Sequence, residues 1–142
     1  MRLTISVSAL LIGVVAAGCG GGGKKSASDN GCPPAASTQS AGNANISAQA
    51  IGKGYDRQIV IRVKDKKSGV PLHGATVLVQ GTMTCPHLMP LYQKGLHEAS
   101  NGTYKGDYNL IMQGQWTISI IVRSKRGDAT TSTLPVTVKI GG

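Results

Sequence analysis

The feature that most constrains the fold is a regular alternation of apolar and polar residues in the second half of the chain. Between positions 116 and 123, every second residue is apolar: Trp116, Ile118, Ile120 and Val122. Successive side chains of a β-strand point to opposite faces, so this pattern predicts a strand with one buried face. A helix would need an apolar repeat near 3.6 residues, and we find no convincing repeat of that kind over three turns.

Several other runs repeat the pattern, and most of them contain β-branched residues: 46–51, 58–64, 75–80, 104–110 and 134–140. Segments containing Gly, Asn or Ser separate them, as expected for turns. About seven short strands in this length predict a single all-β domain, an immunoglobulin-like antiparallel β-sandwich over residues 46–142. Pro135 interrupts the last run and predicts an edge strand, because proline cannot donate a hydrogen bond to a neighbouring strand.

The N-terminus has the form of an export signal. Met1-Arg2 is positively charged, residues 3–17 are uncharged and mostly apolar, and Ala16-Ala17-Gly18 precedes Cys19. The apolar run is shorter than the ~20 residues of a membrane-spanning helix and is typical of a secretory signal peptide that ends in small residues. A cysteine directly after those residues resembles the lipobox of bacterial lipoproteins, although Ala16 stands where that family prefers leucine.

This resemblance implies that residues 1–18 are removed and that Cys19 is lipidated. Its sulfur would carry a diacylglyceryl group and its amino group a further acyl chain such as palmitate. Two or more chains hold a protein stably on a membrane, because each buried methylene contributes about 0.8 kcal/mol. We therefore expect a protein anchored to the extracytoplasmic face of a bacterial membrane. The alternative is an ordinary secretory signal peptide followed by an incidental cysteine.

Residues 19–45 are predicted to be a disordered, flexible linker. They are rich in Gly, Ser, Ala, Asn, Thr and Pro, and four consecutive glycines occupy positions 20–23. Such a composition cannot bury enough apolar surface to offset the entropy of ordering. We expect this segment to hold the β-domain clear of the lipid headgroups.

The net charge of +9 raises the question of a nucleic-acid partner. An extracytoplasmic lipoprotein does not normally meet nucleic acid, and the basic residues are scattered, so we expect none. Two basic groups lie near predicted strand ends: Lys64, Lys66 and Lys67, and Arg123, Lys125 and Arg126. Solvated turns commonly carry such charges. The alternative is attraction to anionic headgroups or cell-wall polymers near the anchor, for which Lys24 and Lys25 are best placed.

Four short motifs in a fixed order resemble one family. They are Gly69–Val77, Met89-Pro90, Gly102–Gly106 and Gly114–Ile118. In this order they resemble the YtkA-like domain, an extracytoplasmic immunoglobulin-like sandwich related to FixH proteins, over about residues 59–122. The resemblance implies a role near copper handling and cytochrome oxidase assembly. Leu91 and Tyr92 follow Pro90, so a second methionine that members often carry there is missing.

Soft ligand types recur at every second position in the middle of the domain. Met83, Cys85, His87 and Met89 alternate with other residues, and His97 follows. Alternate residues of an extended segment share one side, and thioether and imidazole groups suit Cu(I) before Zn(II). Met83, His87, Met89 and His97 are therefore candidate ligands for copper or another soft metal. The alternatives are that Met83 fills the core, that two prolines place His87 and Met89 in a loop, and that His97 is a solvated turn residue.

The remaining cysteines predict a disulfide. Once Cys19 is set aside, Cys32 and Cys85 form an even pair in an oxidising compartment. A disulfide that closes a loop of about 54 residues would add roughly 4 kcal/mol to the free energy of unfolding in the chain-entropy model. Each of the two precedes a proline, which favours extended and accessible backbone. The alternative is that Cys85 stays a free thiol and binds the metal.

Catalytic motifs are missing from the sequence. It has no Gly-x-Ser-x-Gly or His-Glu-x-x-His motif and no phosphate-binding glycine loop, and its six acidic residues form no recognisable pair. We therefore expect a binding protein and not an enzyme: a membrane-anchored extracytoplasmic domain that handles copper or another soft metal. The alternative is a structural or interaction module without a metal site, which holds an envelope protein through its exposed strand edges.

Overall fold

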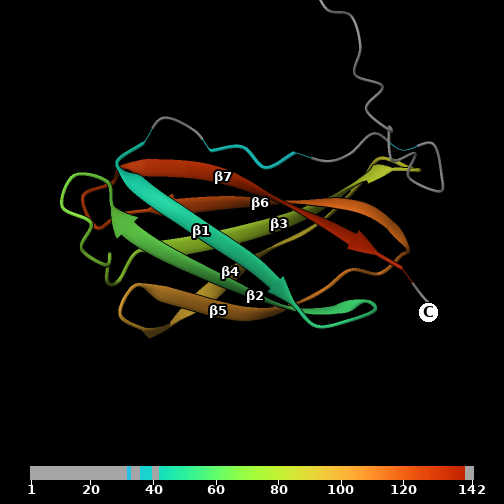
Figure 1. The fold of residues 1–142 in the computed structure, drawn as a ribbon, viewed down its shortest axis with the longest axis horizontal. Helices are drawn as coiled ribbons and strands as arrows, with labels where there is room; N and C mark the ends of the chain where they lie inside the picture. Colours follow the sequence, from blue (N-terminus) through green and yellow to red (C-terminus); the bar gives the residue numbers. More distant parts are fainter. Residues whose placement is uncertain (1–31, 33–35, 40–41, 140–142) are drawn as a thin grey trace, which may run out of the picture.

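The computed structural model describes residues 32, 36–39 and 42–139, and in this part of the chain it contains seven antiparallel strands. Their bounds are β1 (Ala44–Ile51), β2 (Asp56–Asp65), β3 (Thr76–Cys85), β4 (Met89–Ser100), β5 (Thr103–Asn109), β6 (Gly114–Arg123) and β7 (Ala129–Val138). The strand order is β1-β2-β5-β4-β3-β6-β7 (Figure 1). No helix in the described residues is long and apolar enough to cross a membrane. The predicted all-β fold is confirmed.

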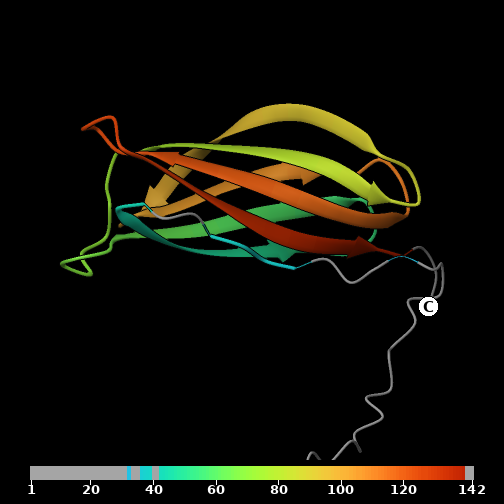
Figure 2. The same ribbon diagram turned by 90° about the horizontal axis from the view of Figure 1, so that it is seen from above.

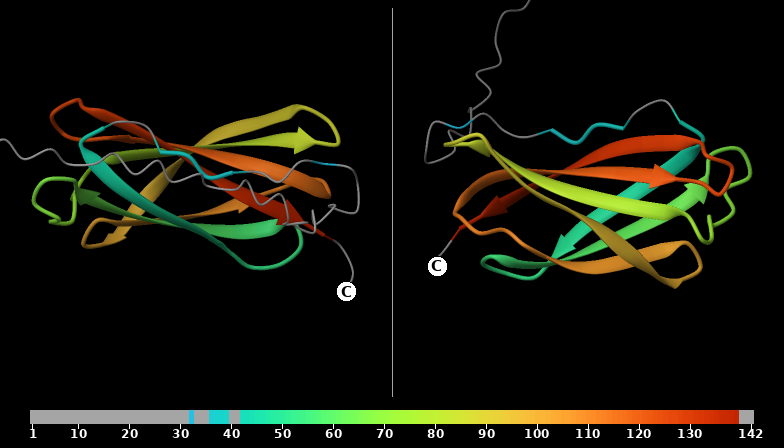
Figure 3. Two further views of the ribbon diagram at one scale, coloured as in Figure 1. Left: turned by 45° about the horizontal axis from the view of Figure 1, so that its top comes forward. Right: turned by 180° about the vertical axis from the view of Figure 1, so that it is seen from behind.

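The strands form two facing layers that β4 joins into one sheet. β1, β2 and β5 lie in one layer, and β3, β6 and β7 lie in the other (Figure 2). β4 pairs with β3 as far as Leu96 and then pairs with β5 from His97 onward. It thereby crosses from one layer to the other (Figure 3). The predicted sandwich is therefore one continuous sheet folded over its core, because a single long strand changes partner.

The alternating residues of the sequence fill the space between the layers. Ile59, Ile61 and Val63 of β2 face Trp116, Ile118 and Ile120 of β6, and all six are at most 1% exposed. Trp116 also satisfies its one polar group, because its Nε1–H donates a hydrogen bond to the Met112 carbonyl at 3.0 Å. Burial of these large side chains is the main force that holds the two layers together.

The strand that the sequence pattern did not predict is β4. Its first half has a hydrogen-bonded neighbour on the β3 side only, since its pairing with β5 begins at His97. A strand with a neighbour on one side only buries few residues. Leu96 is the one fully buried side chain of β4. The apolar alternation is therefore absent. Pro90 is tolerated near the start of this half because one side of the strand does not need its N–H.

β7 lies at the end of the strand order, as Pro135 predicts. A segment assigned to the flexible linker runs beside it, and residues 36–39 follow the strand in Figure 1. Thr133 N–H donates to the Thr38 carbonyl at 2.8 Å, and Thr38 N–H donates to Thr133 Oγ1 at 2.8 Å. Within the predicted linker, the described segment 36–39 is thus held to the β7 edge by the hydrogen bonds of Thr38. Residues 1–31, 33–35 and 40–41 lie outside the described residues.

Candidate functional site

The loops gather at two opposite tips of the domain. The loops 52–55, 86–88 and 110–113 form one tip, here called the Cys85 tip because β3 ends there at Cys85. The loops 66–75, 101–102 and 124–128 form the other, here called the basic tip. In Figure 1 the Cys85 tip is on the right and the basic tip on the left. Each predicted site residue that the structure describes can be placed relative to these two tips.

The four predicted metal ligands do not come together as one site. Met83 is fully buried in the core, and Met89, its partner across the β3–β4 pair, packs partly against the core. His87 is exposed in loop 86–88 of the Cys85 tip. His97 is exposed on β4, eight positions beyond Met89. At about 3.3 Å per residue, that separates the two by roughly 26 Å along the strand.

The expectation of four converging ligands fails because β4 is a long strand and not a loop that folds back. Within the described residues, no three His, Cys, Asp or Glu side chains group as metal ligands. Met83 packs in the core, which was the alternative to its role as a metal ligand. His87 and Met89 remain together at the Cys85 tip.

Cys32 and Cys85 are joined by a disulfide, with Cα atoms 5.8 Å apart. This is the pairing that the cysteine count favours, and it leaves Cys85 without a free thiol for a metal. It also fixes the chain at position 32 to the Cys85 tip. Cys19, the predicted lipidation site, lies outside the described residues.

The basic tip contains a cavity of about 300 Å³ that the sequence analysis did not predict. Its walls come from two loops that are far apart in the sequence: Lys67 and His73 from loop 66–75, and Lys125 and Arg126 from loop 124–128. Val122 and Thr130, both buried, also line it. The two basic groups of the sequence therefore each contribute to one concave surface.

Glycine at position 74 allows the two loops to approach. Its φ is +62°, a conformation that side chains rarely adopt, and a Cβ there would lie 2.5 Å from Lys125 Cε. Lys125 thus extends across the backbone of the neighbouring loop. A larger residue at this position would strain the loop and displace the Lys125 side chain from the cavity rim.

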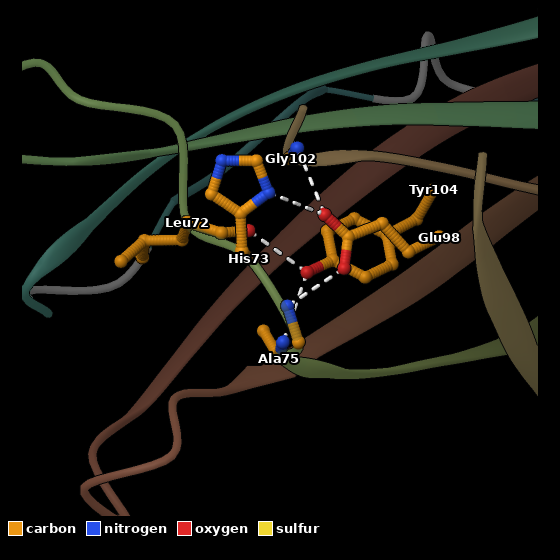
Figure 4. A network of polar contacts seen from close by, with 7 residues as sticks. Leu72, His73, Ala75, Glu98, Gly102 and Tyr104 are labelled. Carbon is orange, nitrogen blue, oxygen red and sulfur yellow. Dashed lines mark hydrogen bonds and ion pairs between the residues drawn. The ribbon is translucent and has the colours of Figure 1, made fainter. Parts of the chain in front are cut away.

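Glu98, on β4, fixes loop 66–75 in place (Figure 4). Its carboxylate accepts hydrogen bonds from Gly74 N–H at 2.7 Å and Gly102 N–H at 3.1 Å. The same carboxylate lies 2.9 Å from His73 Nδ1. The two backbone hydrogen bonds are the main reason that the pKa of Glu98 falls below its ordinary value of 4.5. One ionised side chain therefore ties two loops of the basic tip together.

Tyr104 supports the same loop from the core. Its hydroxyl donates a hydrogen bond to the Leu72 carbonyl at 2.8 Å and accepts one from Ala75 N–H at 2.9 Å (Figure 4). Burial raises the pKa of Tyr104, so the hydroxyl keeps its proton and remains a donor. Because Glu98 and Tyr104 hold the loop from β4 and β5, the cavity wall is formed before any ligand binds.

Two carboxylates, Asp65 and Asp128, also line the cavity. Asp65 accepts hydrogen bonds from Ser68 N–H at 2.8 Å, Ser68 Oγ at 2.9 Å and Lys67 N–H at 3.0 Å. These bonds, led by those from Ser68, lower its pKa and shape the turn that carries Lys67. Asp128 is the other acidic lining residue. Three basic side chains therefore face two carboxylates, and the surface is suited to an anionic group.

Sequence reasoning noted the two basic groups but could not place them together. It also assigned no role to any of the six acidic residues, whereas Glu98 is the residue that organises the basic tip. The sequence signal that could have pointed to Glu98 was the pair of glycines, Gly74 and Gly102, each in a turn between predicted strands. Their N–H groups are the ones that Glu98 binds.

Two comparisons with known proteins bear on the chain. The sequence model of the YtkA-like family matches residues 38–121, a range that runs from the segment beside β7 through most of β6. No curated protein matches the sequence. The family match covers more than half of the chain and includes Glu98, Tyr104 and most of the core strands. The chain therefore belongs to the YtkA-like family.

Proposed function

We propose that the protein is a non-catalytic, lipid-anchored binding domain on the extracytoplasmic face of a bacterial membrane. The binding site is the cavity of the basic tip, and its ligand is an acidic segment of an envelope protein. The observation that carries this proposal is the meeting of Lys67, Lys125 and Arg126 around a preformed cavity. These residues come from two separate turns, so the strand register is what brings their charges together.

The compartment is supported by two independent features. The N-terminal sequence has the order of a lipoprotein signal, with a charged start, an apolar run and small residues before Cys19. The Cys32–Cys85 disulfide is of a kind that persists in oxidising compartments such as the periplasm or the cell surface. A lipid on Cys19 would keep the domain at the membrane while the disulfide forms outside the cytoplasm.

The ligand class follows from the donors at the cavity. Arg126 can bind a carboxylate through two parallel N–H groups, while Lys67 and Lys125 act as point charges. Buried Val122 and Thr130 give the cavity a floor with apolar surface. A side-chain carboxylate flanked by apolar groups fits this combination, and an acidic peptide segment supplies both.

Titration of the mature protein with a short glutamate-rich peptide tests the binding site. We expect the Lys125→Ala/Arg126→Ala variant to bind about tenfold more weakly or worse, since each charged hydrogen bond contributes about 1.5 kcal/mol or more. Lys53→Ala/Lys105→Ala is the matched control, because it removes the same charge from exposed positions outside the cavity. Equal weakening in both variants would mean that only net charge matters, and the proposed site would be wrong.

A second candidate function is the binding of a soft metal at the Cys85 tip, where two of the four predicted ligands lie. His87 and Met89 are two positions apart and offer an imidazole and a thioether, donors that Cu(I) accepts. Competition with a Cu(I) chelator tests this version. His87→Ala/Met89→Leu should lower the affinity, whereas His97→Ala, at the far end of β4, should leave it unchanged. Equal affinity in all three proteins, or no Cu(I) uptake by any, would exclude a copper site at this tip.

A further inference from the structure

Exposed apolar side chains concentrate at the Cys85 tip. Leu88, Ile111 and Met112 lie in its loops and are 81%, 50% and 40% exposed, and Ile51 and Tyr92 lie on the adjoining strands. Among the described residues, Val70 is the one exposed large apolar side chain at the basic tip. Contiguous exposed apolar surface marks a site of interaction with a protein or a membrane.

The loops that carry these side chains lie against each other. At Gly114, which follows loop 110–113, a Cβ would lie 2.5 Å from the Cys85 carbonyl and 3.2 Å from Pro86 Cδ. The start of β6 therefore touches the start of loop 86–88. Leu88, Ile111 and Met112 are therefore carried by two adjoining loops beside the disulfide.

The disulfide decides which tip is nearer to the anchor. Cys32 is bonded to the Cys85 tip, and the chain then runs along β7 before β1 begins at Ala44, next to the basic tip. Without the bond, the first point at which the described chain is fixed to the domain would be the segment 36–39 beside β7. With the disulfide, the chain that leads to the proposed anchor is attached to the domain at the Cys85 tip.

The covalent length between anchor and disulfide is short. Cys19 precedes Cys32 by thirteen positions, which span at most about 45 Å even when fully extended at ~3.3–3.6 Å per residue. A ten-residue strand adds roughly 33 Å between the two tips. The Cys85 tip can therefore reach the lipid surface while the basic tip points away from it.

We propose that the Cys85 tip rests on the lipid bilayer, with Leu88, Ile111 and Met112 inserted at the boundary between headgroups and acyl chains. This inference rests on the proposed lipid anchor at Cys19. A tether raises the effective concentration of the tip at the membrane, so a small apolar surface is enough to hold it there. The basic tip then faces the envelope space, where an acidic partner can enter its cavity.

Tryptophan scanning with brominated lipids tests this orientation. The mature, lipidated protein is placed in phosphatidylcholine/phosphatidylglycerol vesicles, and quenching by brominated acyl chains is measured for Leu88→Trp and for Val70→Trp. Both positions are exposed, so both variants should fold. Trp116 is fully buried and gives a constant background that the unsubstituted protein measures. We expect strong quenching and a blue shift for Leu88→Trp and neither effect for Val70→Trp.

The opposite result would overturn the inference, since quenching at Val70 would mean that the basic tip lies on the anionic lipid. Equal quenching at both positions, or none at either in vesicle-bound protein, would also overturn it. Failure of the anchor itself is distinguished by vesicle flotation, because an unanchored protein would not float with the lipid.

Two further variants test the cause of the orientation. Cys32→Ser/Cys85→Ser, made in the Leu88→Trp background, should lose at least half of the quenching because the tether no longer ends at this tip. If that variant does not fold, Ile111→Ser/Met112→Ser in the same background keeps the disulfide and removes exposed apolar surface. Its quenching should fall by a similar amount. Unchanged quenching in the folded variants would contradict insertion of this tip.

Discussion

At the scale of single residues, Glu98 links the pH of the surroundings to the shape of the basic tip. Its carboxylate accepts hydrogen bonds from Gly74 and Gly102, and these bonds hold its pKa below 4.5 in the folded protein. In the unfolded chain the pKa returns to its ordinary value. The ionised form is therefore favoured by folding, and its contribution is present above about pH 4.5 and lost as the pH falls through the folded value.

Glu98→Gln should consequently lower the urea midpoint at pH 7, because the amide is a weaker acceptor for the two N–H groups. The difference between Glu98→Gln and the unsubstituted protein should shrink as the pH falls below about 4.5, toward the lowered pKa of the folded state. Asp65 also has a lowered pKa, so both proteins lose stability on acidification and the difference between them is the quantity to follow. A difference that stayed constant on acidification would mean that the charge of Glu98 does not stabilise the loops.

At the scale of elements, β4 depends on Tyr108 for its attachment in the middle of the sheet. The Tyr108 hydroxyl donates to the Tyr92 carbonyl of β4 at 2.7 Å and accepts from Gly81 N–H of β3 at 2.7 Å. The β3–β4 register shifts at this point, between Gln80 and Thr82. The buried hydroxyl thus replaces the backbone partner that Gly81 lacks at the irregularity.

Tyr108→Phe should therefore destabilise the fold by about 1–3 kcal/mol, because it leaves a buried N–H and a carbonyl without their partner. Tyr92→Phe is the matched control, since it keeps the ring stacked on Tyr108 with centroids 5.2 Å apart and removes a hydroxyl from a half-exposed residue. Urea denaturation of both variants measures the effect. A Tyr108→Phe midpoint equal to that of Tyr92→Phe would show that the hydroxyl does not stabilise β4.

The elements also explain how far the sequence could predict this protein. Trp116, Ile118 and Ile120 alternate because β6 is an inner strand with one face fully in the core, and such strands were predictable. β4 was not predictable, since half of it is an edge that buries little. The cavity depends on the register that brings Lys67 near Arg126. Local periodicity carries no information about such a contact between distant turns.

At the scale of the whole molecule, the disulfide joins residues 53 positions apart and encloses β1 and β2 and most of β3. In the chain-entropy model, a loop of this length contributes roughly 4 kcal/mol. Cys32→Ser/Cys85→Ser should lose a free energy of unfolding of that order, measured by urea denaturation, and dithiothreitol should have the same effect on the unsubstituted protein. If neither change moved the midpoint, the bond would not constrain the unfolded chain.

The two tips give the molecule its proposed organisation, in which the Cys85 tip faces the lipid and the basic tip faces a partner. This proposed organisation depends on a lipid at Cys19. In it, the apolar loops and the disulfide serve membrane attachment at one tip, and the basic cavity serves partner binding at the other.

Detergent phase partitioning of the protein expressed with its full N-terminus tests for the anchor. The unsubstituted protein should enter the detergent phase, because the acyl chains proposed at Cys19 would carry it there. Cys19→Ala, which cannot accept a lipid, should remain in the aqueous phase or fail to be processed. If Cys19→Ala were processed and still entered the detergent phase like the unsubstituted protein, the anchor at Cys19 would be wrong.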